Sequence, residues 1–279
     1  MSSLVNRALS VYRKEGARVL FKKALKRAHV RSYCRAVSYI GNYSLTVEDQ
    51  TVEFSAPTPT MVERNRKRFS SEYDELSSFL QTIKIDDVVY DVGANTGLYS
   101  LFAAENCQRG TVVAFEPYPP NVEVLRQDIV RNGLDNIEIV EVGLSNSVGE
   151  AEFNQPGTKD VGYGSSSINT ESRGSTVKVQ TTTGDYLVNN GVYPTPDIVK
   201  IDVEGAEPLV IEGMEKILSE SNCRAVFCEI HLSGADRRPS VEDFGFSPEA
   251  IISKLENFGY TTEEIGTSGG SEITIKATK

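Results

Sequence analysis

Residues 88–97 read Val88-Val89-Tyr90-Asp91-Val92-Gly93-Ala94-Asn95-Thr96-Gly97. The stretch begins as a β-branched run, which is typical of a buried strand, and then changes into a loop with two glycines. A helical pattern follows from Leu98. A strand that leads through a glycine-rich loop into a helix is the first unit of a doubly wound α/β sheet, where ligands bind beyond the carboxyl ends of the strands. We therefore predict an α/β fold with a mostly parallel sheet.

A second strand makes a ligand site at this loop more specific. Val112-Val113-Ala114-Phe115-Glu116-Pro117 ends in an acid, which can accept hydrogen bonds from both hydroxyls of a ribose. The dinucleotide fingerprint G-x-G-x-x-G fails at two of its three positions, which are Asn95 and Leu98 here. The pattern D-x-G-x-N-x-G followed by the acid resembles instead the first motif of methyltransferases that use S-adenosylmethionine. A nicotinamide-dependent oxidoreductase on the same fold remains as an alternative.

Composition bounds the class of protein. With 279 residues, the chain is long enough for one large domain and an extension. The net charge is −10, but residues 1–40 carry +9, so the remainder carries −19. An acidic body argues against binding nucleic acid, which requires a basic surface. The chain has no apolar run of 18 residues and no apolar signal-peptide core, and its four cysteines lack metal or redox spacing. We expect a cytoplasmic protein with reduced thiols.

The N-terminal part differs from the rest. Its apolar residues recur at helical spacing among ten Lys and Arg, which predicts one or two amphipathic helices over residues 3–40. The helix either contacts an anionic membrane surface or packs on the acidic body of its own chain, and we favour the second interpretation. Residues 43–56 alternate like a small hairpin. We divide the chain into a basic extension, 1–60, and a cofactor-binding domain, 61–279; the charge run Arg64–Arg68 is interpreted as a solvated helix face.

The remaining pattern completes the predicted sheet. Helices are expected at 98–106, 121–132, 208–219 and 248–258, and strands at 111–116, 137–142, 197–201, 225–231 and 273–276, the last at the far side of the sheet. Leu144 follows the third strand, where such folds usually contact an adenine. Two short strands, 150–153 and 176–180, flank the polar loop Gly162–Ser167 and predict a β-hairpin insertion. That loop is either a lid over the site or an ordinary hairpin loop.

A second informative stretch is Lys200-Ile201-Asp202-Val203-Glu204-Gly205-Ala206-Glu207. Residues two apart on a strand share a face, so Lys200, Asp202 and Glu204 point the same way, as do Glu229 and His231 on the next strand. Both carboxyl ends open onto the predicted cleft. Clustered ionisable groups indicate either pairing or chemistry. We assign Lys200 and Glu207 to structure, and Asp202, Glu229 and His231 to the site.

The motifs D-V-G-A-N-T-G, F-E-P, K-I-D-V-E-G-A-E and E-I-H, in this order, resemble the FkbM-type methyltransferase family over roughly residues 87–232. The resemblance implies a class I, Rossmann-like methyltransferase domain that uses S-adenosylmethionine and most often methylates a hydroxyl on a sugar or natural product. It places the cofactor on a set of loop and strand-end residues: Asp91, Gly93, Ala94, Asn95, Thr96, Gly97, Glu116, Leu144 and Asp202. Residues 1–60 lie outside it, and a domain that has lost catalysis is a further alternative.

The expected chemistry is simple, because the sulfonium methyl is already activated and the protein mainly aligns an acceptor oxygen. A base that removes the hydroxyl proton would help, and His231 or Asp202 can serve. Alternatively, Asp202, Glu204 and Glu229 can hold a divalent cation. No spacing in the sequence requires a metal, so we predict none. The acceptor is expected to be a small molecule, a glycan or a lipid-linked sugar.

Overall fold

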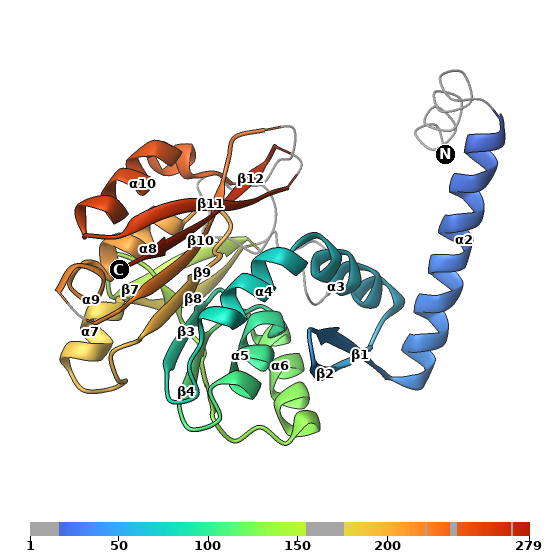
Figure 1. Cartoon of the computed structure of the whole chain (residues 1–279), viewed down its shortest axis with the longest axis horizontal. Coiled ribbons are helices and arrows are strands. Elements are labelled where there is room, and N and C mark those ends of the chain that lie inside the picture. Colours follow the sequence, from blue (N-terminus) through green and yellow to red (C-terminus); the bar gives the residue numbers. More distant parts are fainter. Residues whose placement is uncertain (1–16, 155–175, 221, 235–238, 269) are drawn as a thin grey trace.

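The computed structural model describes residues 17–154, 176–220, 222–234, 239–268 and 270–279. A seven-stranded sheet with the strand order β11-β12-β10-β9-β3-β4-β5 forms its centre (Figure 1). Five of its strands are mutually parallel neighbours: β3 (Val88–Val92), β4 (Thr111–Phe115), β5 (Ile137–Val140), β9 (Ile198–Ile201) and β10 (Ala225–His231). The predicted α/β fold with a mostly parallel sheet is confirmed.

The last two strands form an antiparallel hairpin at one side of the sheet. β12 (Glu272–Thr278) lies between β10 and β11 (Thr261–Ser268) and is antiparallel to both. The prediction that the last strand lies at the far side of the sheet is therefore wrong. The preceding helix, α10 (Pro248–Asn257), leads to the outer position first, and a tight turn can then return the chain only antiparallel.

Helices cover both faces of the sheet. On one face, α4 (Tyr73–Thr82), α5 (Leu98–Asn106) and α6 (Pro119–Asn132) enclose a core that includes Phe79, Phe102 and Leu125. On the other face lie α7 (Gly184–Asn189), α8 (Glu207–Gly213), α9 (Glu215–Glu220) and α10. The helix predicted at 208–219 is thus broken in two, at Met214. A 3₁₀ turn, Val241–Phe244, precedes α10.

A smaller sheet of three strands forms the predicted insertion. β6 (Gly143–Leu144) pairs with β8 (Thr176–Thr182), which pairs in turn with β7 (Gly149–Asn154). Tyr118, Phe153 and Val179 form its small apolar core. The predicted loop Gly162–Ser167 lies outside the described residues. The insertion follows directly from strand β5, so it stands beside the carboxyl ends of the parallel strands.

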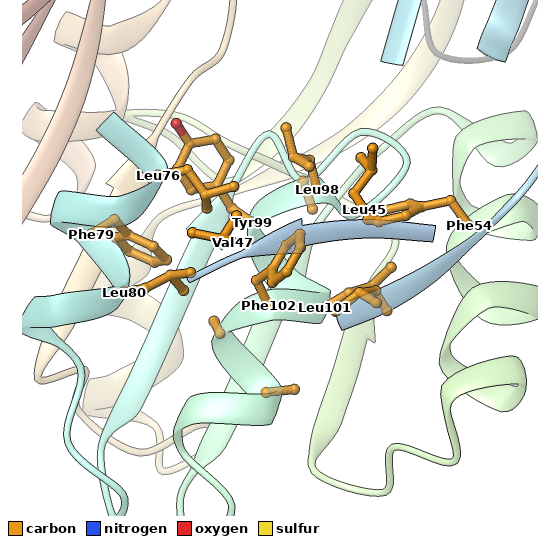
Figure 2. Packing of buried hydrophobic residues seen from close by; sticks show 14 of the residues in the cluster. Leu45, Val47, Phe54, Leu76, Phe79, Leu80, Leu98, Tyr99, Leu101 and Phe102 are labelled. Carbon is orange, nitrogen blue, oxygen red and sulfur yellow. The ribbon is translucent and has the colours of Figure 1, made fainter. Parts of the chain in front are cut away.

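The N-terminal hairpin packs on the main body. β1 (Asn42–Val47) and β2 (Gln50–Ser55) form the predicted hairpin, and Leu45, Val47 and Phe54 lie in the same core as α5 (Figure 2). α3 (Pro59–Ser71) follows, with Thr58 capping its first turn. The hairpin is tied to α6, because the Asp128 carboxylate accepts hydrogen bonds from the Ser55 N–H (2.8 Å) and hydroxyl (2.5 Å).

Helix α2 (Ala17–Ile40) extends away from the body for much of its length (Figure 1). Residues 21–29 are all exposed, including Phe21 at 64% and Leu25 at 54%, whereas Cys34 and Val37 are buried near its end. The interpretation that this helix packs on its own acidic body is therefore wrong for its first half. No helix in the described parts of the chain combines the length and hydrophobicity needed to cross a bilayer.

Candidate active site

A pocket opens at the carboxyl ends of β3, β4 and β9, where the sequence predicts ligand binding. It encloses about 580 Å³ of space, a figure that includes space open to solvent. Polar and apolar side chains share its lining, among them Asn95, Glu116, Leu144, Phe153, Asp202 and Glu204. The loop after β3, the end of β4, the insertion and the turn after β9 all contribute to it.

The turn at Gly93 requires glycine. Its φ of +86° is in the left-handed region, and a Cβ there would lie 1.8 Å from the carbonyl oxygen of Asp202. The N–H groups of Gly93 and Ala94 both donate to the carbonyl of Phe115 at 3.0 Å. Because of this close approach, the loop after β3 is held against both β4 and the turn after β9.

Glu116 is fixed at the floor of the pocket. One carboxylate oxygen accepts a hydrogen bond from the Asn95 N–H and the other from the Tyr118 N–H, both at 2.8 Å. Burial raises the pKa of Glu116 to about 7, although these two backbone donors oppose the shift. Asn95 has a positive φ of 53°, and its side-chain oxygen is buried without a hydrogen-bond partner among the described residues. This orphaned acceptor next to Glu116 indicates that a ligand donates to it.

The predicted cofactor residues fall into two groups. Gly93, Asn95, Glu116, Leu144 and Asp202 line the pocket. The pocket lining does not include Asp91, Ala94, Thr96 and Gly97. Asp91 accepts a hydrogen bond from the Ser100 hydroxyl of α5 at 2.5 Å, and burial raises its pKa. Residues of this second group therefore support the loop without lining the pocket.

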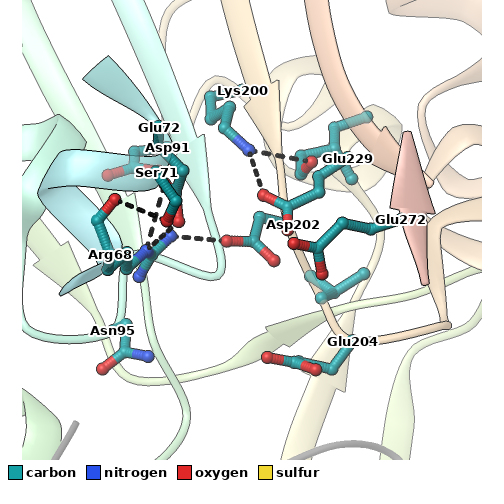
Figure 3. A network of polar contacts seen from close by, with 12 residues as sticks. Arg68, Ser71, Glu72, Asp91, Asn95, Lys200, Asp202, Glu204, Glu229 and Glu272 are labelled. Carbon is teal, nitrogen blue, oxygen red and sulfur yellow. Dashed lines mark hydrogen bonds and ion pairs between the residues drawn. The ribbon is translucent and has the colours of Figure 1, made fainter. Parts of the chain in front are cut away.

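An ionic network adjoins the pocket (Figure 3). Arg68 of α3 pairs with Asp202 at 2.6 Å and with Glu72 at 2.9 Å, while Lys200 lies 3.7 Å from Glu229. The structural role predicted for Lys200 is confirmed by this pair. The interpretation of Arg64–Arg68 as a solvated face is wrong for Arg68, because its partner Asp202 is supplied by a strand end far along the chain.

Glu229 is the more strongly perturbed acid of this network. Burial is the first cause that raises its pKa well above the usual range, and the neighbouring Asp202 carboxylate adds to it. Burial would lower the pKa of Lys200, but Asp202 and then Glu229 raise it overall. The lysine therefore stays charged, whereas the Glu229 carboxyl resists ionisation.

His231 is buried against several carboxylates. Its Nδ1 lies 3.0 Å from Oε1 of Glu207, and its Nε2 lies 3.5 Å from Glu204, 3.7 Å from Glu229 and 3.9 Å from Glu272. Burial would lower the pKa of His231, but Glu207 in particular raises it well above its ordinary value. His231 is not among the pocket-lining residues. A protonated imidazole cannot accept a proton, so in this state His231 is a poor general base.

Glu207 has the structural role that the sequence predicts. Its Oε1 accepts hydrogen bonds from the N–H groups of Gly205 (2.9 Å) and Val203 (3.3 Å), which closes the turn after β9. Within the same turn, Glu204 adopts a positive φ of 54° and reaches the pocket. The turn thus directs Asp202 and Glu204 toward the ligand side and Glu207 toward His231.

Comparison with known proteins identifies the family. A family model described as the methyltransferase FkbM domain matches residues 91–262. The chain belongs to the FkbM methyltransferase family. Of the alternatives that the sequence leaves, this membership supports the methyltransferase. The seven-stranded sheet with one antiparallel strand is the class I, Rossmann-like methyltransferase architecture, as predicted.

Two proteins named as methyltransferases are similar to part of the chain. Hexuronic acid methyltransferase AglP of Haloferax volcanii is 33% identical over 165 residues, which cover 59% of this chain and 64% of that protein. Methyltransferase sdnD of Sordaria araneosa is 28% identical over 158 residues, 46% of this chain and 60% of that one. The chain thus matches less than two thirds of the length of either relative.

A solved structure supports the fold alone. Methyltransferase FkbM from Methylobacillus flagellatus KT superposes with a TM-score of 0.51 at 13% identity, covering 80% of this chain and 54% of that chain.

The sequence alone missed several site residues of this FkbM domain. Phe115, Pro117, Asn121 and Phe153 line the pocket, and Arg68 and Glu72 complete the ionic network. Asn121 carries a usable signal, because it opens the helix after the acidic strand end and faces Glu116. Phe153 gives no such signal, since only the docking of the insertion brings it to the pocket.

Proposed function

We propose that this FkbM family member binds S-adenosylmethionine in the pocket and transfers its methyl group to a hydroxyl of a sugar or glycan. The observation that carries the proposal is the buried Glu116 carboxylate, held by two backbone N–H groups beside the unpartnered side-chain oxygen of Asn95. The Glu116 carboxylate at the end of the second strand suits the hydroxyls of a ribose, which donate to its oxygens. The match to a hexuronic acid methyltransferase supports a sugar acceptor.

The lining fits the parts of this cofactor. Glu116 would hold the ribose, and Leu144 with Phe153 would cover the adenine with apolar surface. Gly93 and Asn95 would contact the methionine part, while Asp91, Ala94, Thr96 and Gly97 keep their loop in shape behind them. The cofactor supplies a methyl group that is already activated, so these residues bind and orient rather than activate.

Asp202 is the residue we place at the acceptor. It lines the pocket together with Glu204, and Arg68 holds one of its carboxylate oxygens at 2.6 Å. Its second oxygen can accept the proton of an incoming hydroxyl. Glu229 and His231 lie behind it and act by positioning and by setting the charge of the network.

The enzyme is proposed to work in the cytoplasm, with α2 touching an anionic membrane surface when the acceptor is lipid-linked. Exposed apolar residues, Phe21 and Leu25, share the first half of α2 with Lys22, Lys26 and Arg27. Such a helix binds anionic lipid through both features. Under this proposal residues 61–279 are the methyltransferase domain and residues 1–60 its extension, with the hairpin docked.

The methyl-transfer proposal is tested with labelled cofactor. Calorimetry should show micromolar-range binding of S-adenosylmethionine that weakens roughly tenfold or more in Glu116→Ala. The reason is that loss of a hydrogen bond to a charged group costs about 1.5–3 kcal/mol of binding free energy. Labelled methyl should then pass to hexuronic acids, glycans or lipid-linked sugars. Wild-type protein without measurable affinity for the cofactor would exclude the proposal.

The membrane contact is tested separately by sedimentation with vesicles. At low ionic strength, full-length protein should pellet with phosphatidylglycerol vesicles and stay in solution with phosphatidylcholine vesicles. The pair Phe21→Ser with Leu25→Ser should reduce pelleting without changing cofactor affinity. High salt should release the protein, because it screens the attraction. Full-length protein that remains in the supernatant at low salt rules this contact out.

A further inference from the structure

His231 is held like a metal ligand. Its side chain is only 2% exposed, and its Nε2 has no hydrogen-bond partner among the described residues. Nδ1–H donates to Oε1 of Glu207, an oxygen that also accepts two backbone N–H groups and is therefore an acceptor. In the neutral imidazole this contact places the lone pair on Nε2, so a cation that binds there takes the place of the Nε2 proton. A carboxylate that orients a histidine in this way is the common outer-shell partner of metal-bound imidazole.

Carboxylates surround the free nitrogen. Oxygens of Glu204, Glu229 and Glu272 lie 3.5, 3.7 and 3.9 Å from Nε2. Two ligands that each lie about 2.2 Å from one ion are separated by roughly 3 to 4.4 Å, so these distances leave room for an ion between them. One potential ligand atom from each of Asp202, Glu229 and His231 lies within 4.8 Å of the other two. Figure 3 shows the carboxylates of Asp202, Glu229 and Glu272 around one space.

We propose that His231, Glu229 and Asp202 form a site for one divalent cation, with Glu204 and Glu272 as further oxygen donors and Glu207 as the outer-shell carboxylate. Three strand ends contribute: β9, β10 and β12. One imidazole among several carboxylates suits Mn²⁺, because oxygen ligands favour Mg²⁺, Ca²⁺ and Mn²⁺ while imidazole favours transition metals. The proposal departs from the expectation from sequence that no metal is required.

The site adjoins the ligand pocket. Asp202 and Glu204, which are two of its proposed oxygen donors, also line the pocket. With the cation bound, Asp202 would be a ligand rather than the proton acceptor; the cation would bind the acceptor oxygen and lower the pKa of its hydroxyl, so that the proton can pass to solvent. This role rests on the proposed methyl transfer, whereas the ion site itself does not.

The test measures metal binding without cofactor or acceptor. Full-length protein freed of metal with chelator is titrated with Mn²⁺ and followed by electron paramagnetic resonance, which separates bound from free ion. One equivalent should bind per chain. Electron spin-echo modulation should show ¹⁴N coupling from a directly bound imidazole, a readout that needs no variant. Binding of several ions without nitrogen coupling would mean adventitious binding to the acidic surface and overturn the proposal.

Variants assign the ion to these residues. Glu229→Gln and Glu207→Gln keep the side-chain volume and should each weaken Mn²⁺ binding by about tenfold to a hundredfold. If one of these more buried variants does not fold, Glu272→Gln replaces it and should also weaken Mn²⁺ binding. Glu220→Gln, an exposed acid at the end of α9, is the matched control and should leave Mn²⁺ affinity unchanged. Equal affinity in all of these variants would overturn the site.

The cation site and the proposed methyl transfer can be contradicted independently of each other. Wild-type protein that binds S-adenosylmethionine but no Mn²⁺ would eliminate the cation site and leave His231 as a buried imidazolium, with methyl transfer untouched. Protein that binds one Mn²⁺ with nitrogen coupling but no cofactor would preserve the site and remove the proposed function.

Discussion

At the scale of single residues, the proposed contact between Glu116 and the ribose would make cofactor binding depend on pH. Its pKa is raised to about 7 by burial, so its contribution to folding stability is complete below the unfolded pKa of roughly 4.5 and is lost as pH rises through about 7. Ribose hydroxyls donate to the ionised form, so cofactor affinity should fall about tenfold per pH unit below 7. Calorimetry in buffers of different ionisation enthalpy should detect proton release at pH 6.5.

The control for this pH effect is Glu116→Gln, which cannot ionise. Its cofactor affinity should be lower than that of wild type and nearly constant from pH 6 to 8. A wild-type affinity that is equally flat over this range would mean that Glu116 does not receive the ribose.

Gly93 and Gly133 allow the cost of a steric clash to be distinguished from the cost of a left-handed backbone conformation. Both have positive φ, but a Cβ on Gly93 would meet the Asp202 carbonyl at 1.8 Å whereas one on Gly133 has nothing within 4 Å. Gly133→Ala should therefore cost about 1–2 kcal/mol of unfolding free energy. Gly93→Ala should cost roughly 3 kcal/mol or more and also weaken cofactor binding. Urea unfolding measures both, and equal losses would contradict the contact.

At the scale of elements, α2 has two halves with different energetics. Removal of residues 1–28 takes away the exposed part of α2 that contains Phe21 and Leu25, and should leave the melting temperature unchanged. Removal of residues 1–40 also takes away Cys34 and Val37, which are buried against the body. Burial of two such side chains is worth roughly 2–4 kcal/mol, so the longer truncation should melt several degrees lower. Thermal unfolding compares them, and equal melting temperatures would contradict this division.

Helices and strands with a strong local sequence pattern were predictable. Features that depend on contacts with distant parts of the chain were not. The bounds of α5 are the same as those predicted, because an apolar run follows a glycine loop. β11 was not predicted, since Thr261–Ser268 is a polar strand at the edge of the sheet. Arg68 was misjudged because its partner Asp202 is 134 residues away. Distances of that kind are set by the topology and leave no trace in the local sequence.

At the scale of the whole molecule, the charge of the body acts on the acceptor. Residues 41–279 carry −19. If the proposed sugar acceptor is a hexuronic acid, it is itself an anion, and the two repel at long range. Salt screens such repulsion. For a charged acceptor, kcat/KM should rise severalfold between about 20 and 200 mM salt. A neutral sugar acceptor is the control and should show little change. A fall for the charged acceptor would indicate a cationic binding surface instead.

The pairing of β3 with β9 has a consequence for how fast the protein folds. These central strands are neighbours in register from Val89 with Ile198 to Val92 with Ile201, yet β4, β5 and the whole insertion lie between them in the chain. Closing so large a loop costs conformational entropy before the stabilising contacts between the strands have formed. Long-range parallel pairing therefore slows folding. The loop after β3, at Gly93, and the turn after β9, at Asp202, therefore come together only after β3 and β9 have paired late in folding. Refolding followed by ligand binding should lag behind the recovery of helix signal.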